Sequence, residues 1–221
     1  MNNVRIFPSI LTLDFSDLRN QILEAEENGA SGIHIDVMDG QFVPPITFGT
    51  PIIEAVRKVT SLPLDVHMMV IEPHRHFGQL VESGADSITF HIEAVDNPIP
   101  NLETLGELGV GRSIALNPGT GTEVVIPFLH RLDQVLLMSV EPGYGGQKFI
   151  DQTVSKIALL KTEIRNRSLP VQIQVDGGIN KCTLLKISRS GADVAVAGSA
   201  IFNHSFSVAE GLKSLIEIAN S

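Results

Sequence analysis

Short apolar runs alternate with stretches of helical spacing along the whole chain. Eight runs rich in aliphatic and β-branched residues predict strands, and they cover residues 6–9, 33–37, 64–69, 87–91, 113–117, 134–140, 171–176 and 194–199. Between them, apolar residues recur every three or four positions, as at Leu18, Ile22 and Ala25, which is typical of an amphipathic helix. A strand-then-helix order repeated eight times favours a parallel barrel surrounded by helices.

Glycine and proline mark the junctions between these elements. Four junctions share a glycine followed by a small or β-branched residue, at residues 28–33, 83–88, 108–114 and 190–195. Glycine there predicts the left-handed residue that ends a helix. An open, doubly wound sheet is the alternative, but the eight units nearly use up the 221 residues and no linker divides them. We therefore expect one (β/α)₈ TIM barrel, the catalytic domain, over residues 1–221.

Composition narrows the class of protein. Hydrophobic residues make up 43% of the chain, which excludes a disordered protein. The net charge of −9 disfavours a nucleic-acid or anionic-membrane partner. Cys182 is the single cysteine, which excludes an intrachain disulfide and fits a reducing compartment. Neither a signal peptide nor a bilayer-spanning apolar run is visible, so we expect a cytoplasmic protein.

Polar residues concentrate where the predicted strands end, and active sites of such barrels lie at the carboxyl ends of the strands. By strand alternation, His34 and Asp36 share one face of the second strand, and His67 shares a face of the third strand with Asp65. Asp176 ends the seventh strand. Two histidines and two carboxylates suit a divalent metal. A single histidine is more often a hydrogen-bonded core residue, but four such residues at matching strand ends favour a site.

Other residues near the strand ends have more than one interpretation. Asp36 and Asp176 would form an acid/base pair for proton transfer beside a metal-polarised carbonyl. Met38, Met69 and Met138 also lie near strand ends. Methionines there either belong to the core or shield a carbanion-like intermediate from water. His91 ends the fourth strand and is either pocket-lining or structural.

Glycine clusters follow the last three predicted strands. They are Gly143, Gly145 and Gly146, then Gly177 and Gly178, then Gly198 with Ser199. Loops after the last strands of a barrel often hold a phosphate through backbone N–H groups. The chain has no G-x-x-x-x-G-K-[ST] motif, so nucleoside triphosphate binding is not supported.

Seven segments of the chain resemble the motifs of the ribulose-phosphate 3-epimerase family. They lie in order at residues 8–11, 34–44, 64–69, 115–118, 138–149, 175–179 and 197–202. The departures from the family pattern are Pro45, where asparagine is frequent, Gly121, where proline is common, and Tyr144, where phenylalanine is usual. Pro45 and Tyr144 border loops that could cover a substrate.

The resemblance implies a phosphate-binding barrel enzyme of the pentose phosphate pathway and the Calvin cycle. It would reversibly epimerise D-ribulose 5-phosphate to D-xylulose 5-phosphate at C3 through an enediolate. Asp36 would accept the proton and Asp176 would donate one. His34, Asp36, His67 and Asp176 would hold one divalent ion, which could be Zn²⁺, Fe²⁺, Mn²⁺ or Co²⁺.

The resemblance also implies a set of substrate contacts and a homo-oligomer. The contacts are Ser9, His67, Gly143, Tyr144, Gly145, Gly146, Asp176, Gly177, Gly178, Gly198 and Ser199. Two other functions stay open at this point. One is epimerisation of a related ketose phosphate such as D-allulose 6-phosphate, and the other is a barrel that binds sugar phosphate without catalysis.

Overall fold

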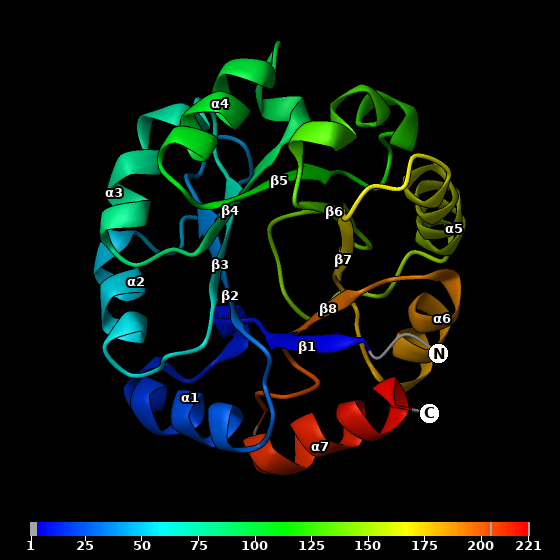
Figure 1. Ribbon diagram of the computed structural model, residues 1–221. Helices are drawn as coiled ribbons and strands as arrows, with labels where there is room; N and C mark the ends of the chain where they lie inside the picture. Colours follow the sequence, from blue (N-terminus) through cyan, green and yellow to red (C-terminus); the bar gives the residue numbers. More distant parts are fainter. Residues whose placement is uncertain (1–3, 204, 221) are drawn as a thin grey trace.

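Eight parallel strands form a barrel in the computed structural model, which describes residues 4–203 and 205–220 (Figure 1). The strands are β1 (Arg5–Pro8), β2 (Ile33–Met38), β3 (Leu64–Met69), β4 (Ser87–His91), β5 (Gly111–Leu116), β6 (Gln134–Met138), β7 (Gln172–Asp176) and β8 (Val194–Ala197). Each strand pairs with the next one along the chain from β2 to β8, and β8 pairs with β1. A parallel bridge between Ser9 and His34 lies at the seam between β1 and β2. The predicted TIM barrel is confirmed.

Helices surround the barrel on the outside (Figure 1). They are α1 (Leu18–Glu27), α2 (Thr50–Arg57), α3 (Phe77–Glu82), α4 (Ile99–Glu107), α5 (Gln152–Asn166), α6 (Lys181–Ser190) and α7 (Val208–Ala219). No helix in the described ranges is long and apolar enough to cross a membrane.

The connection between β5 and β6 differs from the expected α-helix. It consists of two 3₁₀ segments, η5 (Thr122–Val124) and η6 (Ile126–Arg131). Pro127 lies in the first turn of η6. Because proline lacks an N–H group and disfavours the α conformation in the residue before it, a continuous α-helix is interrupted at this point.

The glycine junctions adopt the predicted geometry, whereas some strand ends shift. The residues that follow α1, α3, α4 and α6 include Gly29, Gly84, Gly109 and Gly191, with φ between +73° and +108°. The sixth and eighth strands end two residues earlier than predicted. After β8, the Gly198 carbonyl accepts hydrogen bonds from the N–H groups of Ile201 and Phe202, so the chain turns over the barrel mouth instead of continuing the sheet.

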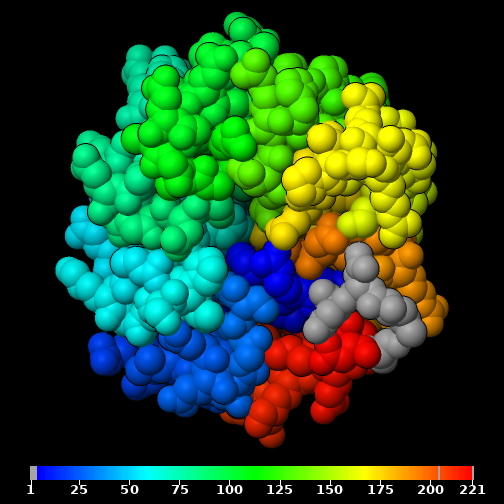
Figure 2. Space-filling model, in the orientation of Figure 1, coloured from blue at the N-terminus to red at the C-terminus, as the bar shows by residue number. Residues whose placement is uncertain are grey.

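Side chains that alternate along a strand face either the apolar core between the barrel and the helices or the inside of the barrel. On β2 and β3, Ile33, Ile35, Leu64, Val66 and Met68 belong to the large apolar core that includes the helices. The residues between them point into the barrel, and their side chains are polar or belong to methionine. Side-chain atoms close the centre of the ring in the space-filling view (Figure 2). The sequence therefore places a polar layer inside the barrel, and this layer supports the site.

Candidate active site

Four side chains converge inside the barrel mouth. His34 and Asp36 come from β2, His67 from β3 and Asp176 from the end of β7. One ligand atom of each lies within 4.8 Å of those of the others. His34 Nε2 lies 3.3 Å from Asp36 Oδ1, and His67 Nδ1 lies 3.1 Å from the same oxygen. Both histidines are fully buried, while the Asp176 side chain is 16% exposed. The structure thus brings together the four residues that the sequence selects as metal ligands.

The donor set fits a divalent cation. His34 Nε2 is buried and has no hydrogen-bond partner among the described residues, although it points at the carboxylates of Asp36 and Asp176. Its other ring nitrogen, Nδ1, lies 2.8 Å from Asp65 Oδ2. A carboxylate on one ring nitrogen leaves the lone pair of the other available to a metal. The orphaned nitrogen beside two carboxylates therefore has the chemistry of a metal ligand.

Asp65 holds the His34 ring through the contact with its Nδ1. The sequence pattern assigned no role to Asp65. It accepts hydrogen bonds from Ser87 Oγ at 2.6 Å and from Gln174 Nε2 at 2.7 Å. The sequence pattern places Asp65 on the same face of its strand as His67. That pattern does not show which residues of other strands its carboxylate contacts. These bonds fix the carboxylate and through it the orientation of the His34 ring.

The pKa values of Asp36 and Asp176 shift in opposite directions. Although burial opposes it, the adjacent His34 and His67 hold the pKa of Asp36 well below its usual range. Burial, followed by the charge of Asp36, raises the pKa of Asp176 to about 7. Burial also opposes ionisation of His34, but Asp36 and Asp65 raise the pKa of that ring well above its usual value. In the ion-free protein, a proton on His34 therefore supplies the positive charge that a metal would supply.

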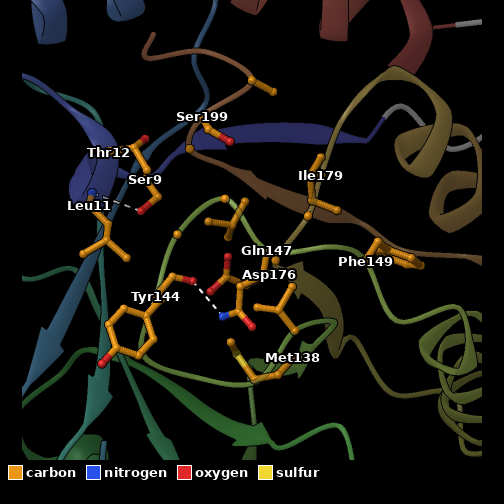
Figure 3. Close-up of a pocket in the computed structure, with 18 of the residues that line it drawn as sticks. Ser9, Leu11, Thr12, Met138, Tyr144, Gln147, Phe149, Asp176, Ile179 and Ser199 are labelled. Atoms are coloured by element: carbon orange, nitrogen blue, oxygen red, sulfur yellow. Dashed lines mark hydrogen bonds between the residues drawn. The ribbon is translucent and has the colours of Figure 1, made fainter. Parts of the chain in front are cut away.

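A cavity of about 570 Å³ opens above this cluster at the carboxyl ends of the strands. In the view of Figure 3, Ser9, Thr12 and Ser199 lie on one side, Phe149 and Ile179 on the other, and Asp176 between them. The cavity is lined by every predicted site residue except His34 and His67: Ser9, Asp36, Met38, Met69, Met138, Gly143, Tyr144, Gly145, Gly146, Asp176, Gly177, Gly178, Gly198 and Ser199. The two histidines lie beneath its floor.

Ser9 and the three methionines lie close to the carboxylates. Ser9 Oγ donates a hydrogen bond of 2.7 Å to Asp36 Oδ2. Met38 and Met69 form an apolar cluster with Val43, and Met138 is also buried. All three methionines pack against apolar neighbours and also line the cavity; their shielding of an intermediate stays a prediction.

The glycine turns allow backbone to approach backbone closely on one wall of the cavity. Gly178 has φ +63°, and a Cβ atom there would lie 2.6 Å from Phe149 N. A Cβ atom at Gly198 would lie 2.9 Å from Thr12 Oγ1. That hydroxyl is buried and has no hydrogen-bond partner within the described ranges, so Thr12 is a polar lining residue that the sequence prediction missed.

The two loops that carry departures from the family pattern touch each other. A Cβ atom at Gly143 would lie 3.5 Å from Pro45 Cδ. Gln147 Nε2 donates a hydrogen bond of 2.9 Å to the Tyr144 carbonyl (Figure 3) and one of 2.6 Å to the Glu141 carbonyl. The Tyr144 side chain itself is largely exposed. The glycine loop is thus braced from within while its aromatic side chain faces outward.

His91 contacts the cluster from the far side. Its ring is fully buried, and its Nε2 lies 2.8 Å from Nε2 of His67. Phe42 packs against the His91 ring with 4.7 Å between centroids. His91 does not belong to the cavity lining; it supports His67 instead.

These features define the protein's class as a (β/α)₈ barrel with a cavity at the carboxyl ends of the strands and a buried histidine–aspartate cluster in its floor. The sequence profile of the ribulose-phosphate 3-epimerase family matches residues 5–202. The chain belongs to this family.

Relatives in three lineages support that assignment. The chain is 45% identical over 203 residues to the ribulose-phosphate 3-epimerase of Bacillus subtilis, with 91% of this chain and 94% of the relative covered. It is 42% identical to the ribulose-phosphate 3-epimerase of Synechocystis, with 91% and 88% covered. It is 39% identical to the chloroplastic ribulose-5-phosphate-3-epimerase of Arabidopsis thaliana, with 91% and 72% covered.

More distant solved structures share the fold alone. A 3-hexulose-6-phosphate synthase has a TM-score of 0.72 at 18% identity, with 97% of this chain and 99% of that chain covered. A phosphoribosyl anthranilate isomerase from Thermus thermophilus has a TM-score of 0.69 at 15% identity, with 98% of each chain covered. Both similarities extend over nearly the whole barrel.

Proposed function

We propose that this protein catalyses the reversible epimerisation of D-ribulose 5-phosphate and D-xylulose 5-phosphate at C3, with residues 1–221 acting as one catalytic domain. Family membership supports the substrate class, because relatives 39–45% identical over about nine-tenths of the chain carry that activity in their names. The observation that carries the mechanism is the pair of carboxylates, Asp36 and Asp176, which belong to one cluster and both line the cavity.

Epimerisation removes a proton from one face of a carbon and returns one to the other face. Asp36, with its lowered pKa, is ionised at neutral pH and accepts the C3 proton. Asp176, which burial and the charge of Asp36 make the weaker acid of the two, donates a proton to the opposite face. In the reverse direction the two residues exchange roles. A pair of acids whose environments separate their pKa values is the usual arrangement for such acid/base chemistry.

The metal ligands that we propose are His34, Asp36, His67 and Asp176. Zn²⁺, Fe²⁺, Mn²⁺ and Co²⁺ all accept two imidazoles and two carboxylates. When bound, such an ion supplies positive charge that stabilises the negative charge developing on the substrate's carbonyl oxygen. The chain's own part is to hold these ligands rigidly, through Asp65 for His34 and through the Ser9 hydrogen bond for Asp36.

The remaining predicted residues would bind the rest of the substrate. Ser9, in the cavity lining, and His67, beneath its floor, are both beside Asp36 and would serve the sugar end of the substrate. The glycines from Gly143 to Gly146, Gly177 and Gly178, and Gly198 with Ser199, line the outer wall, where backbone N–H groups can bind a phosphate. Tyr144 borders the same wall. Met38, Met69 and Met138 would exclude water from the planar enediolate.

The proposal also includes the oligomeric state and the cellular location of the protein. The homo-oligomer rests on the family resemblance; Phe15 and Phe206, both about 40% exposed, line one surface pocket. The single free cysteine, which is exposed, supports a reducing location such as the cytoplasm. A chloroplastic relative shows that the family also serves in another compartment.

Turnover of ribulose 5-phosphate, measured by coupled detection of xylulose 5-phosphate, tests this proposal. We expect activity to fall below a hundredth after treatment with a chelator and to return when one divalent metal is added back. D-allulose 6-phosphate serves as the competing substrate in the same assay. A higher kcat/KM for the hexose would contradict the proposed substrate, and activity unchanged by thorough chelation would contradict the metal requirement.

A further inference from the structure

His67 has a hydrogen-bonded partner on each ring nitrogen. Its Nδ1 faces the cluster, 3.1 Å from Asp36 Oδ1 and 3.8 Å from Asp176 Oδ2. Its Nε2 lies 2.8 Å from His91 Nε2. The two rings are nearly parallel, with centroids 5.0 Å apart, and both are fully buried. Two facing imidazole nitrogens form a hydrogen bond only if one carries a proton and the other does not.

Glu93 lies at the outer end of this contact. Its Oε2 is 3.2 Å from His91 Nδ1. Its Oε1 accepts hydrogen bonds from the Asn117 N–H at 2.8 Å and from Thr120 Oγ1 at 2.5 Å. Although burial opposes it, hydrogen bonds from His91 and Thr120 lower the pKa of Glu93 to about 2. The carboxylate is therefore ionised at neutral pH and only accepts hydrogen bonds.

The turn that holds Glu93 is itself anchored. Lys156 Nζ, from α5, donates to the carbonyls of Asn117 at 2.9 Å and Pro118 at 3.2 Å. Asn117 and Pro118 belong to the segment 115–118 that resembles a family motif, yet none of residues 115–120 lines the cavity. The contacts of this turn indicate that it serves Glu93 and not the substrate directly.

Glu93 lies at the outer end of this chain of hydrogen bonds and Asp36 at the inner end, and both carboxylates accept hydrogen bonds. A divalent ion on His67 Nδ1 would replace the proton at the inner end, and the acceptor at the outer end then fixes the direction of the remaining hydrogen bonds. Glu93 accepts a hydrogen bond, so His91 Nδ1 carries a proton. The buried His91 ring is neutral, since burial lowers its pKa to about 4, and its Nε2 therefore carries none. His67 Nε2 must then donate to His91 Nε2, which leaves the lone pair of His67 Nδ1 directed at the cluster. We propose that Glu93 and His91 are positioning residues that set the tautomer of His67, so that its Nδ1 is ready to bind the divalent ion. This inference rests on the proposed metal-dependent function.

The tautomers of His34 and His67 would thus be set in different ways. Asp65 acts on His34 directly and its side chain is 2% exposed. The Glu93 side chain is 24% exposed at the barrel rim and acts on His67 through a second imidazole. Partners of this kind typically change metal affinity 10- to 100-fold when they are removed.

The Glu93→Gln variant tests this relay, the chain of hydrogen bonds from Glu93 through His91 to His67, with little change in the shape of the side chain. The amide oxygen would keep the hydrogen bonds from Asn117 and Thr120, and the amide nitrogen would then donate to His91 Nδ1. That reverses the order of protons and puts a proton on His67 Nδ1. We expect the Kd for Zn²⁺, measured on metal-free protein by competition with a chromophoric chelator, to rise by about 10- to 100-fold.

Glu123→Gln is the matched control, because Glu123 lies in η5 on the same side of the barrel and makes the same charge change. We expect its Kd for Zn²⁺ to stay within about twofold of the wild-type value. Unchanged affinity in Glu93→Gln, with normal binding by the wild type, would overturn the relay alone. Absence of Zn²⁺ binding by the wild type would contradict the proposed function as well.

A second measurement does not depend on a variant that folds. The ¹⁵N shifts of the histidine ring nitrogens in the zinc-loaded wild type report which nitrogen carries the proton. We expect protons on His67 Nε2 and His91 Nδ1. A proton on His91 Nε2 with none on His67 Nε2, or a protonated His67 Nδ1, would overturn the proposal whatever the variants do.

Discussion

Asp36 and Asp176 are chemically identical side chains whose oxygens lie within 4.8 Å of each other, yet they titrate in opposite directions. Asp36 lies between two imidazoles and accepts a hydrogen bond from Ser9. Asp176 lies farther from both rings, 3.8–3.9 Å away, and faces the charge of Asp36. A second negative charge in a buried site is unfavourable, so one carboxyl keeps its proton. The acid/base difference is a property of these surroundings.

The metal-free protein should lose stability as the pH rises from 6.5 to 8. The folded-state pKa of Asp176 is raised to about 7 and that of His34 is raised, so the folded state holds protons that the unfolded chain has released. Stability therefore falls as pH increases, by up to about 1.4 kcal/mol per pH unit for His34 and by less for Asp176, whose contribution ends as the pH passes about 7. His67 and His91 have lowered pKa values and act in the opposite direction, but only below about pH 6.5.

Thermal unfolding of chelator-treated protein across this pH range provides the measurement. The Asp176→Asn variant should show a smaller fall in Tm between pH 6.5 and 8, because one of the two titrating groups is gone. Asp96→Asn, at an exposed position after β4, should keep the wild-type slope. A Tm that rises with pH in the metal-free wild type would contradict the assigned protonation states.

At the level of single elements, the turns after β6, β7 and β8 shape the cavity wall because their glycines leave room for neighbouring backbone or side chains to approach closely. Gly178 shows this most clearly, because it combines a left-handed φ of +63° with a neighbouring backbone nitrogen only 2.6 Å from where a Cβ would lie. We expect Gly178→Ala to lower the free energy of unfolding by about 1–3 kcal/mol. We also expect it to raise KM for the sugar phosphate, since the loop at Phe149 must move.

Gly78→Ala is the control for this substitution. Gly78 lies in α3, with nothing within 4 Å of the added carbon, so the change should be neutral or stabilise the protein by about 0.5–1 kcal/mol. KM and unfolding by denaturant, measured on both variants, give the comparison. A wild-type KM in Gly178→Ala would show that this turn does not shape the substrate site.

The spacing of apolar residues and the positions of glycine and proline were enough to predict the repeated strands and most of the helices. The strict alternation of His34, Asp36, His67 and Asp65 against Ile35 and Val66 placed the cluster on the inner face. Three things lay beyond sequence pattern. Two 3₁₀ segments replace the helix expected between β5 and β6, and Pro127 lies in the second of them. The contacts of Asp65 with Gln174 and of His91 with His67 depend on strand register and ring orientation, which alternation does not specify.

At the scale of the whole molecule, closure of the barrel makes the site possible. The cluster draws on β2, β3 and β7, separated by more than a hundred residues along the chain. At the seam between β1 and β2, the Ser9–His34 bridge is accompanied by the Ser9–Asp36 hydrogen bond. The barrel's last closing contact therefore also orients the residue that we propose as the proton acceptor.

The central claim is that Asp36 and Asp176 move protons on opposite faces of C3 in a pentose 5-phosphate. Conversion of ribulose 5-phosphate in D₂O, followed by NMR of the xylulose 5-phosphate formed, tests it most directly. The account predicts that the product carries deuterium at C3, and that Asp176→Asn, although folded, forms product at least 100-fold more slowly. Product that retains its original hydrogen at C3, or wild-type turnover in Asp176→Asn, would contradict it.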